Sequence, residues 1–183
     1  HAWGWEPCTI ADVKAYKPEN KSIVSGQVLQ CPYDFKKARL VVREMADALA
    51  LDLVDKGLVT NQLVLTVGYD RENLDDPSRR QSYHGPVTTD RYGRKIPKHA
   101  VGTENFPYTS SASDLLKAVS ALYDRIVDEN LLIRRLSISA NKLLPEVDVP
   151  KDEAEQLDLF TDYAAKEQRE QADEAAYARE RKI

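Results

Sequence analysis

Cysteine is scarce in this sequence, and its two copies are far apart. Cys8 and Cys31 are the only cysteines among 183 residues, and neither belongs to a C-x-x-C pair. A zinc knuckle and a secreted disulfide scaffold both need closely spaced cysteines, so the sequence excludes both. We therefore expect two free, buried thiols with a structural role, in a protein of the reducing cytoplasm.

Long apolar runs and an initiating methionine are also missing. No stretch of about 18 apolar residues and no signal-peptide core is present, so we expect a soluble protein with no membrane partner. Because the chain starts at His1, we expect it to continue a longer polypeptide. The hydrophobic content of 42% suffices for one ordinary core, which predicts a single domain with appendages.

Signatures of catalysis are absent as well. The sequence has three histidines, no G-x-S-x-G elbow and no G-x-x-x-x-G-K-[ST] loop. The acidic cluster of Asp70, Glu72, Asp75 and Asp76 lacks the glycine and the ligand spacing of a calcium loop. We therefore expect no catalytic residue, no metal site and no cofactor in this chain.

Charge is distributed unevenly along the chain. Residues 151–183 contain six basic and ten acidic side chains, which account for the whole net charge of -4. The first 150 residues are neutral in sum, so affinity for nucleic acid must come from local clustering. Between positions 79 and 99, six basic residues stand against the single acid Asp90; they are Arg79, Arg80, Arg91, Arg94, Lys95 and Lys98.

Hydrophobic periodicity predicts four strands and two helices. We expect strands at residues 22–29, 62–69, 98–106 and 133–141, and helices between Asp34 and Gly57 and after the capping residue Ser111. Both helical segments have one apolar stripe at a spacing of three and four residues. Residues 70–97 are polar and too long for a tight turn, so we expect an extended loop or an irregular ribbon there.

The order strand, helix, strand, strand, helix, strand predicts a ferredoxin-like, split βαβ fold of the α+β class. Two helices with one apolar face each cover one side of a four-stranded sheet, so the other side faces solvent or a ligand. Along the last strand, Leu136, Ile138 and Ala140 alternate with Arg135, Ser137, Ser139 and Asn141. The second set suits phosphate binding, although a solvated sheet face has a similar composition.

Three segments resemble the C-terminal half of Y-family DNA polymerases and occur in that family's order. They are Ala2-Trp3-Gly4-Trp5-Glu6-Pro7, Ser22-Ile23-Val24-Ser25-Gly26-Gln27-Val28-Leu29 and Ile133-Arg134-Arg135-Leu136-Ser137-Ile138. The likeness is greatest to the bacterial branch that includes the SOS mutagenesis polymerases. It implies the end of a thumb domain with a linker in residues 1–21, a little-finger DNA-binding domain in residues 22–145 and an acidic tail, helical or disordered, in residues 146–183.

The resemblance also implies a role and a location. In this family a palm domain with Mg²⁺ ions catalyses nucleotide transfer, and no stretch of this chain resembles the palm motifs. We therefore expect a non-catalytic part of a polymerase for translesion synthesis and DNA repair in the SOS response, held on primer-template DNA in the bacterial cytoplasm at the nucleoid. The rest of the polymerase chain is a further expected partner. Trp3 replaces the usual basic residue of the thumb segment, which puts a DNA contact there in doubt.

Candidate DNA contacts come from two sources. The family's opening and closing strands imply Lys21, Ser22, Ser25, Arg134, Arg135, Ser137 and Ser139. Charge alone adds the loop residues Arg94, Lys95, Lys98 and His99.

The tail contains a second recognisable motif, Q-L-D-L-F. Its residues Gln156, Leu157, Asp158, Leu159 and Phe160 resemble the peptide by which bacterial polymerases and repair proteins bind the β sliding clamp. In an extended peptide, the apolar side chains can enter a groove while the Gln156 amide makes directional hydrogen bonds. The alternative is a helix edge that covers its own core, but Pro150 and the acidic residues after it disfavour a helix leading into the motif.

Another function class stays open at this point. The domain could be an adaptor that binds protein and is recruited to the replication clamp without touching DNA. Salt-dependent binding to generic duplex DNA separates the two hypotheses, because only a DNA grip shows it.

Overall fold

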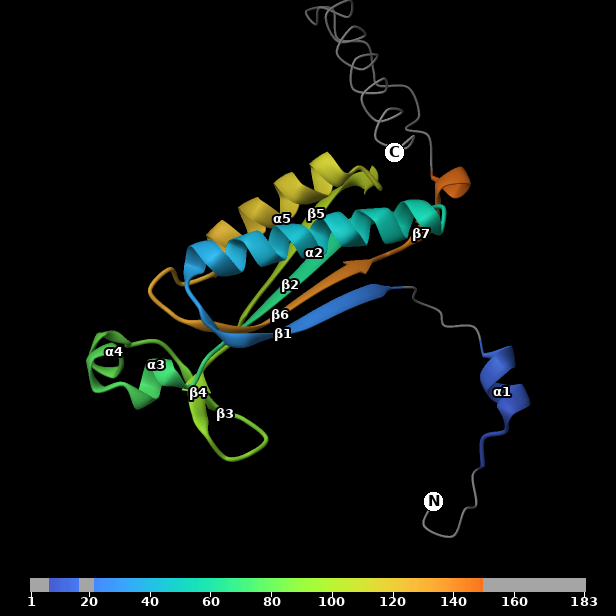
Figure 1. The fold of residues 1–183 in the computed structure, drawn as a ribbon. Helices are drawn as coiled ribbons and strands as arrows, with labels where there is room; N and C mark the ends of the chain where they lie inside the picture. The colour runs from blue at the N-terminus through green and yellow to red at the C-terminus, as the bar shows by residue number, and fades with distance from the viewer. Residues whose placement is uncertain (1–6, 17–21, 150–183) are drawn as a thin grey trace, which may run out of the picture.

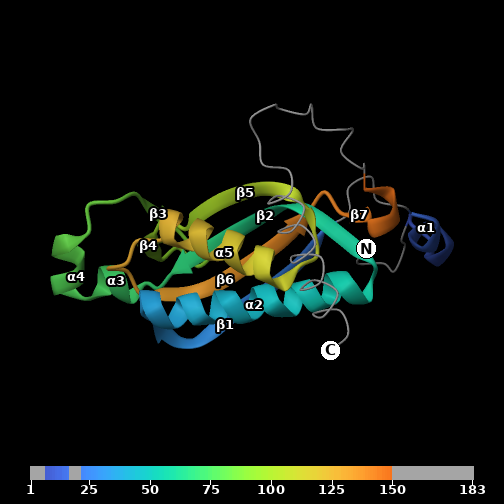
Figure 2. The ribbon, with the colours of Figure 1, turned by 90° about the horizontal axis from the view of Figure 1, so that it is seen from above.

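The computed structural model describes residues 7–16 and 22–149 of the chain. Its centre is an antiparallel sheet with the strand order β1-β6-β2-β5, to which the short strand β7 adds at the start of β2. The strands are β1 (Ile23–Tyr33), β2 (Leu58–Tyr69), β5 (Ala100–Thr109), β6 (Ile133–Asn141) and β7 (Leu144–Pro145). Helices α2 (Phe35–Asp55) and α5 (Ala112–Ile126) lie on one side of this sheet and leave the other side uncovered (Figure 1, Figure 2). The predicted ferredoxin-like α+β fold is confirmed.

Helix α2 begins and ends close to where the sequence predicts. The Asp34 carboxylate accepts a hydrogen bond from the Lys37 amide at 2.8 Å, which caps the first turn. At the other end, Gly57 has a φ of +61°, the left-handed conformation that terminates many helices and favours glycine. The buried stripe of the helix contains Ala38, Val42, Met45, Ala46, Leu49, Ala50 and Leu53.

The core lies between this stripe, the matching stripe of α5 and the inner face of the sheet. On β2, Leu63, Leu65, Val67 and Tyr69 are buried, as the alternation predicts. Tyr123 of α5 joins the two helices, because its hydroxyl donates a hydrogen bond to the Phe35 carbonyl at 2.9 Å and its ring centre lies 4.9 Å from that of Phe35. Burial raises the pKa of the Tyr123 hydroxyl, which therefore remains a donor.

The segment between β2 and β5 is more structured than the sequence predicted. It contains the short helices α3 (Glu72–Asp75) and α4 (Pro77–Ser82) and a hairpin of β3 (Val87–Thr89) and β4 (Lys95–Pro97). The hairpin corresponds to the expected ribbon, whereas the helices were missed because four and six residues are too few to show a helical period.

One buried side chain attaches this segment to the sheet. The Asn73 amide group donates to the Asp70 and Leu132 carbonyls at 2.8 Å, and its oxygen accepts from the Leu132 amide at 2.8 Å. All three bonds are shielded from water, so α3 is held against the start of β6.

Two smaller expectations are wrong. Cys8 and Cys31 are both exposed rather than buried. Cys31 lies on the edge strand β1, in the part between Val28 and Tyr33 where the pairing with β6 is irregular, so no neighbouring layer covers it. Within the predicted linker, a Thr9 capping box starts the exposed helix α1 (Ile10–Ala15).

The chain leaves the sheet after β7 through a single helical turn, η1 (Glu146–Asp148). Within the described ranges, no helix is long and apolar enough to cross a membrane.

Candidate nucleic-acid interface

The uncovered side of the sheet contains small and neutral side chains and ends in arginine. Strand pairing places these residues on it: Val24, Gly26, Val28, Gln62, Val64, Thr66, Gly68, Val101, Thr103, Asn105, Arg135, Ser137, Ser139 and Asn141. None of these paired positions is an Asp or a Glu, although the chain contains 30 acidic residues. We call this surface the open face.

A β-bulge places two consecutive arginines at the end of the open face. Arg135 pairs with Gly68 and the next pair is Ile133 with Tyr69, so Arg134 is an extra residue on β6. Ile133 and Leu136 on either side are fully buried under the helices. Both arginines therefore turn away from the core, whereas strict alternation would send one of them into it.

Gly68 makes room for the second arginine. A Cβ atom at position 68 would lie 3.2 Å from the Cβ of Arg135, closer than ordinary side-chain contacts. The Arg135 guanidinium is exposed and has no ion-pair or hydrogen-bond partner among residues 7–16 and 22–149. It is therefore a cation available to a ligand.

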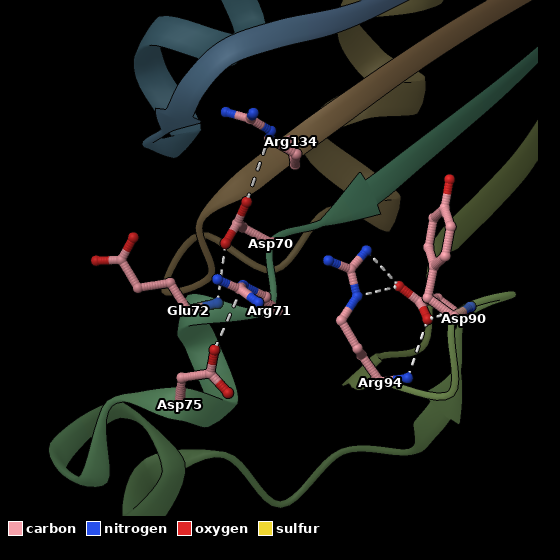
Figure 3. A network of polar contacts seen from close by, with 8 residues as sticks. Asp70, Arg71, Glu72, Asp75, Asp90, Arg94 and Arg134 are labelled. Atoms are coloured by element: carbon pink, nitrogen blue, oxygen red, sulfur yellow. Dashed lines mark hydrogen bonds and ion pairs between the residues drawn. The ribbon is translucent and has the colours of Figure 1, made fainter.

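A groove of about 910 Å³ opens between this end of the sheet and the β3–β4 hairpin. Its basic and aromatic lining consists of Tyr69, Arg71, Arg91, Tyr92, Arg94, His99, Arg134 and Arg135. Acidic residues line it too, and Figure 3 shows how they are arranged.

Three of the groove arginines are paired with carboxylates. Arg94 contacts Asp90 at 2.7 Å, Arg71 contacts Asp75 at 3.5 Å and Arg134 contacts Asp70 at 3.8 Å (Figure 3). The hydrogen bond from the Arg94 side chain is the main cause that lowers the pKa of Asp90, so this pair is charged on both sides at neutral pH. Arg135 and Arg91 remain outside these pairs.

The acidic residues of the segment have structural roles. Asp70 accepts a hydrogen bond from the Glu72 amide at 2.9 Å, and Asp76 accepts one from the Ser78 amide at 2.8 Å and so caps α4. No group of three or more His, Cys, Asp or Glu side chains in the described part of the chain is arranged to hold a metal ion.

The four loop residues that were predicted from charge alone, Arg94, Lys95, Lys98 and His99, do not all line the groove. Arg94 and His99 line the groove, together with Thr88 and Ile96. Lys95 lines only a second cavity of about 660 Å³, together with Val87, because side chains alternate between the two faces of the hairpin; Arg94 lines both cavities. Lys98 lines neither cavity, and its amide donates to the Pro86 carbonyl at 2.8 Å.

The strand residues taken from the family pattern are also divided. Ser137 and Ser139 lie on the open face, where the Ser139 hydroxyl donates to Asn141 at 2.8 Å. Ser25 pairs with the buried Ile138 and so lies on the helix side, which corrects its assignment to the binding surface. The physical reason is the two-residue period of a strand, which the family pattern alone did not take into account.

The remaining predicted contacts cannot be placed on this surface. Ser22 is exposed and directly precedes β1. Lys21 and the clamp-motif residues Gln156, Leu157, Asp158, Leu159 and Phe160 lie outside the described residues, as does the thumb-like segment 1–6.

Two groove residues, Arg91 and Tyr92, were not singled out as site residues. Both belong to the hairpin turn Asp90-Arg91-Tyr92-Gly93-Arg94. An aspartate three residues before a glycine is a turn signal, and it could have indicated that the residues between them are presented at a tip.

Comparison with known proteins identifies the domain type. Residues 20–159 match the family model described as the impB/mucB/samB family C-terminal domain. A solved structure, the complex of a β-clamp processivity factor and the little finger domain of PolIV, is 10% identical; the match covers 77% of this chain and 100% of that one, with a TM-score of 0.44. A likeness at this level says nothing about binding partners. A comparison with curated proteins finds no match.

Proposed function

The chain belongs to the impB/mucB/samB family as the non-catalytic C-terminal, little-finger domain of a Y-family translesion DNA polymerase, and on this premise we propose that its open face holds the backbone of duplex DNA. The proposal covers the open face and the unpaired Arg135 at its end. It adds that the tail motif at residues 156–160 tethers the domain to the sliding clamp.

The observation that carries the proposal is the charge pattern of the open face. Duplex DNA has one negative charge about every 1.7 Å along its axis, so a carboxylate facing it would be repelled. The 14 paired positions of the open face contain no carboxylate and end in Arg135, whose charge is not neutralised by any described residue. Because strands in general contain few Asp and Glu residues, the uncompensated Arg135 at the end of the face, more than the missing acids, favours DNA over solvent.

The neutral part of the face suits phosphate contacts without base readout. Hydroxyl and amide side chains such as Ser137, Ser139 and Thr103 donate hydrogen bonds to phosphate and sugar oxygens, which position a protein on DNA but convey no sequence. We therefore propose binding that is insensitive to base sequence, as a polymerase that must move along its template requires.

Arg135→Ala tests the duplex-binding proposal. We expect the variant to bind every duplex sequence more weakly by a similar factor, and the slope of log affinity against log salt to fall by about 0.9 for the lost phosphate contact. Fluorescence anisotropy with two unrelated duplexes over a salt series measures both quantities.

Two controls locate the effect. Arg43→Ala removes the same side chain from an exposed position on α2, on the other side of the sheet, and should leave affinity and slope unchanged. The double change Arg94→Ala with Lys95→Ala should cost less than Arg135→Ala, because Arg94 is already paired with Asp90 and Lys95 faces another cavity. Duplex binding without salt dependence, or none at all, would instead support the adaptor hypothesis.

The tether rests on the sequence of the tail. A Q-L-D-L-F peptide combines apolar anchors with a hydrogen-bonding amide, which suits a clamp groove. The described structure is compatible with such a tether, because the chain leaves the sheet beyond β7, at the end of β6 opposite to Arg134 and Arg135 (Figure 1).

A further inference from the structure

The tip of the β3–β4 hairpin is held in one conformation by its own residues. The Asp90 carboxylate accepts hydrogen bonds from the Tyr92 amide at 2.8 Å and the Arg94 amide at 3.0 Å, in addition to its pair with the Arg94 side chain. Gly93 closes the turn with a φ of +78°, which other residues rarely adopt. The turn is therefore a preformed support for the residue at its tip.

That residue, Tyr92, is an aromatic side chain with little covering it. Its relative exposure is 67%, and the guanidinium carbons of Arg91 and Arg94 lie 5.1 and 5.0 Å from its ring centre. The same ring lines the groove that contains Arg135 and His99. Of these two arginines, Arg91 is not paired with a carboxylate, whereas Arg94 is paired with Asp90. An exposed aromatic ring beside cations is the combination that proteins use to bind unpaired nucleotides.

We propose that this groove binds an unpaired nucleotide of a single strand that continues from the duplex, with its base stacked on Tyr92 and its phosphate at Arg135. The inference rests on the proposed duplex grip, since the groove adjoins the end of the open face at Arg135. Single-stranded DNA is the occupant because a duplex hides its base faces in the stack and offers none to a tyrosine ring.

The size and charge of the groove limit the ligand to a short piece of strand. A volume of about 910 Å³ lies within the range of about 300–1,000 Å³ that holds a ligand of nucleotide dimensions. Pairing with Asp70, Asp75 and Asp90 leaves only Arg91 and Arg135 of the five groove arginines uncompensated, and Glu72 also lines the groove. This balance suits one or two phosphates rather than a long backbone track.

The test compares two DNA ligands with the full chain: a blunt duplex, and the same duplex with a short single-stranded extension that contains 2-aminopurine. Wild type should bind the extended duplex more tightly and quench the 2-aminopurine fluorescence. Tyr92→Ala should lower affinity for the extended duplex by about 5-fold to 150-fold, the usual effect of losing one stacking platform, and abolish the quenching. Affinity for the blunt duplex should not change.

Matched variants make the result specific. Tyr92→Phe keeps the ring and should behave as wild type, and Tyr16→Ala removes a tyrosine of 73% exposure from α1 and should have no effect. The inference is overturned if wild type does not prefer the extension, if Tyr92→Ala weakens both ligands equally, or if Tyr92→Phe fails to restore binding. Failure of the duplex grip is seen separately, as an unchanged blunt-duplex affinity in Arg135→Ala.

Discussion

At the scale of single residues, the bulge at Arg134 decides which side chains the open face presents. The extra residue on β6 shifts the alternation by one, so that Ile133 and Leu136 are both buried and the two arginines between them both face outward. If the same residues paired without a bulge, one guanidinium would point toward the helices, where burying an unpaired charge is costly. Gly68 complements the bulge by leaving room beside Arg135.

Another glycine determines how closely α5 approaches the sheet. A Cβ atom at Gly102 would lie 2.7 Å from a methyl group of Leu122 and 2.8 Å from one of Ile126. Because the core around Leu122 is fully buried, these groups have little freedom to move. We expect Gly102→Ala to lower the free energy of unfolding by about 1–3 kcal/mol, the usual cost of overpacking.

Gly26 provides the matched control on the same sheet. A Cβ atom there meets nothing closer than 3.9 Å, so Gly26→Ala should be neutral or raise the free energy of unfolding by about 0.4–1 kcal/mol, since alanine restricts the unfolded chain. Urea unfolding of the two variants and wild type measures both effects. Equal stabilities for the two alanine variants would show that α5 does not need the space at position 102.

At the scale of elements, the two helices are joined by an ion pair as well as by Tyr123. The Arg39 side chain of α2 donates two hydrogen bonds to the Asp124 carboxylate of α5, at 2.7 and 2.8 Å. Arg39 and Asp124 are 32% and 46% exposed, so water screens the pair and its contribution is about 0.2–1 kcal/mol. The hydrogen bond from Arg39 is the main cause that lowers the pKa of Asp124.

This pair predicts a pH dependence with a definite sign. A carboxylate with a lowered pKa in the folded state stabilises the protein above its unfolded pKa of about 3.9 and loses that contribution as the pH falls through the folded value. We expect Asp124→Asn to be less stable than wild type at pH 7, and the difference to shrink as the pH falls below about 4. Urea unfolding of both proteins at a series of pH values measures this difference in the free energy of unfolding.

A double-mutant cycle with Arg39→Ala isolates the coupling between the two side chains. Glu44→Gln is a control, because Glu44 is exposed on α2 and has no ion pair within the described residues. A stability difference for Asp124→Asn that persists unchanged at pH 3 would show that the carboxylate charge does not stabilise the helix pair.

At the scale of the whole molecule, the hairpin groove and the point where the described chain leaves the sheet lie at opposite ends of the sheet. β6 begins at Ile133, beside the groove, and ends at Asn141, next to the turn that leads to β7 and η1 (Figure 1). The proposed DNA-binding surface and the point from which the proposed clamp tether departs are therefore separated by about 25 Å of strand.

The tail prediction follows from that separation. Replacing Leu159 and Phe160 by alanine removes two apolar anchors, each a possible hot spot of about 2 kcal/mol or more, from a peptide whose micromolar affinity totals only about 8 kcal/mol. Clamp binding should almost vanish, while the melting temperature and the duplex affinity of the domain stay unchanged. Calorimetry, a clamp pull-down with purified β clamp and duplex anisotropy on the same samples measure all three.

The double alanine variant has a control in the tail itself. Leu159→Ile with Phe160→Tyr keeps apolar bulk at both positions and should retain part of the clamp affinity. A melting temperature several degrees lower in the alanine variant would mean that Leu159 and Phe160 belong to the domain core, which would remove the main support for a tether.

The sequence by itself determined the domain type, the order of the long elements and the residues of the core. Periodicity is a local property, so β2, β6 and the apolar stripes of α2 and α5 could be recognised from spacing, and the Y-family resemblance, which the family match confirms, rested on short continuous motifs. The predicted strand boundaries were less accurate at the sheet edge. The first strand was expected to end at residue 29, whereas β1 continues to Tyr33.

Only the tertiary structure decided which of the candidate residues lie together. Ser25 and Ser137 look equivalent in sequence, but strand parity places them on opposite sides of the sheet. Arg94 and Lys95 are neighbours in sequence, but only Arg94 lines the groove, while Arg135 and Tyr92 lie 43 positions apart and both line it. The physical reason is that a binding surface is made by strand register, a bulge and a folded insertion, which are all products of long-range pairing rather than of local sequence.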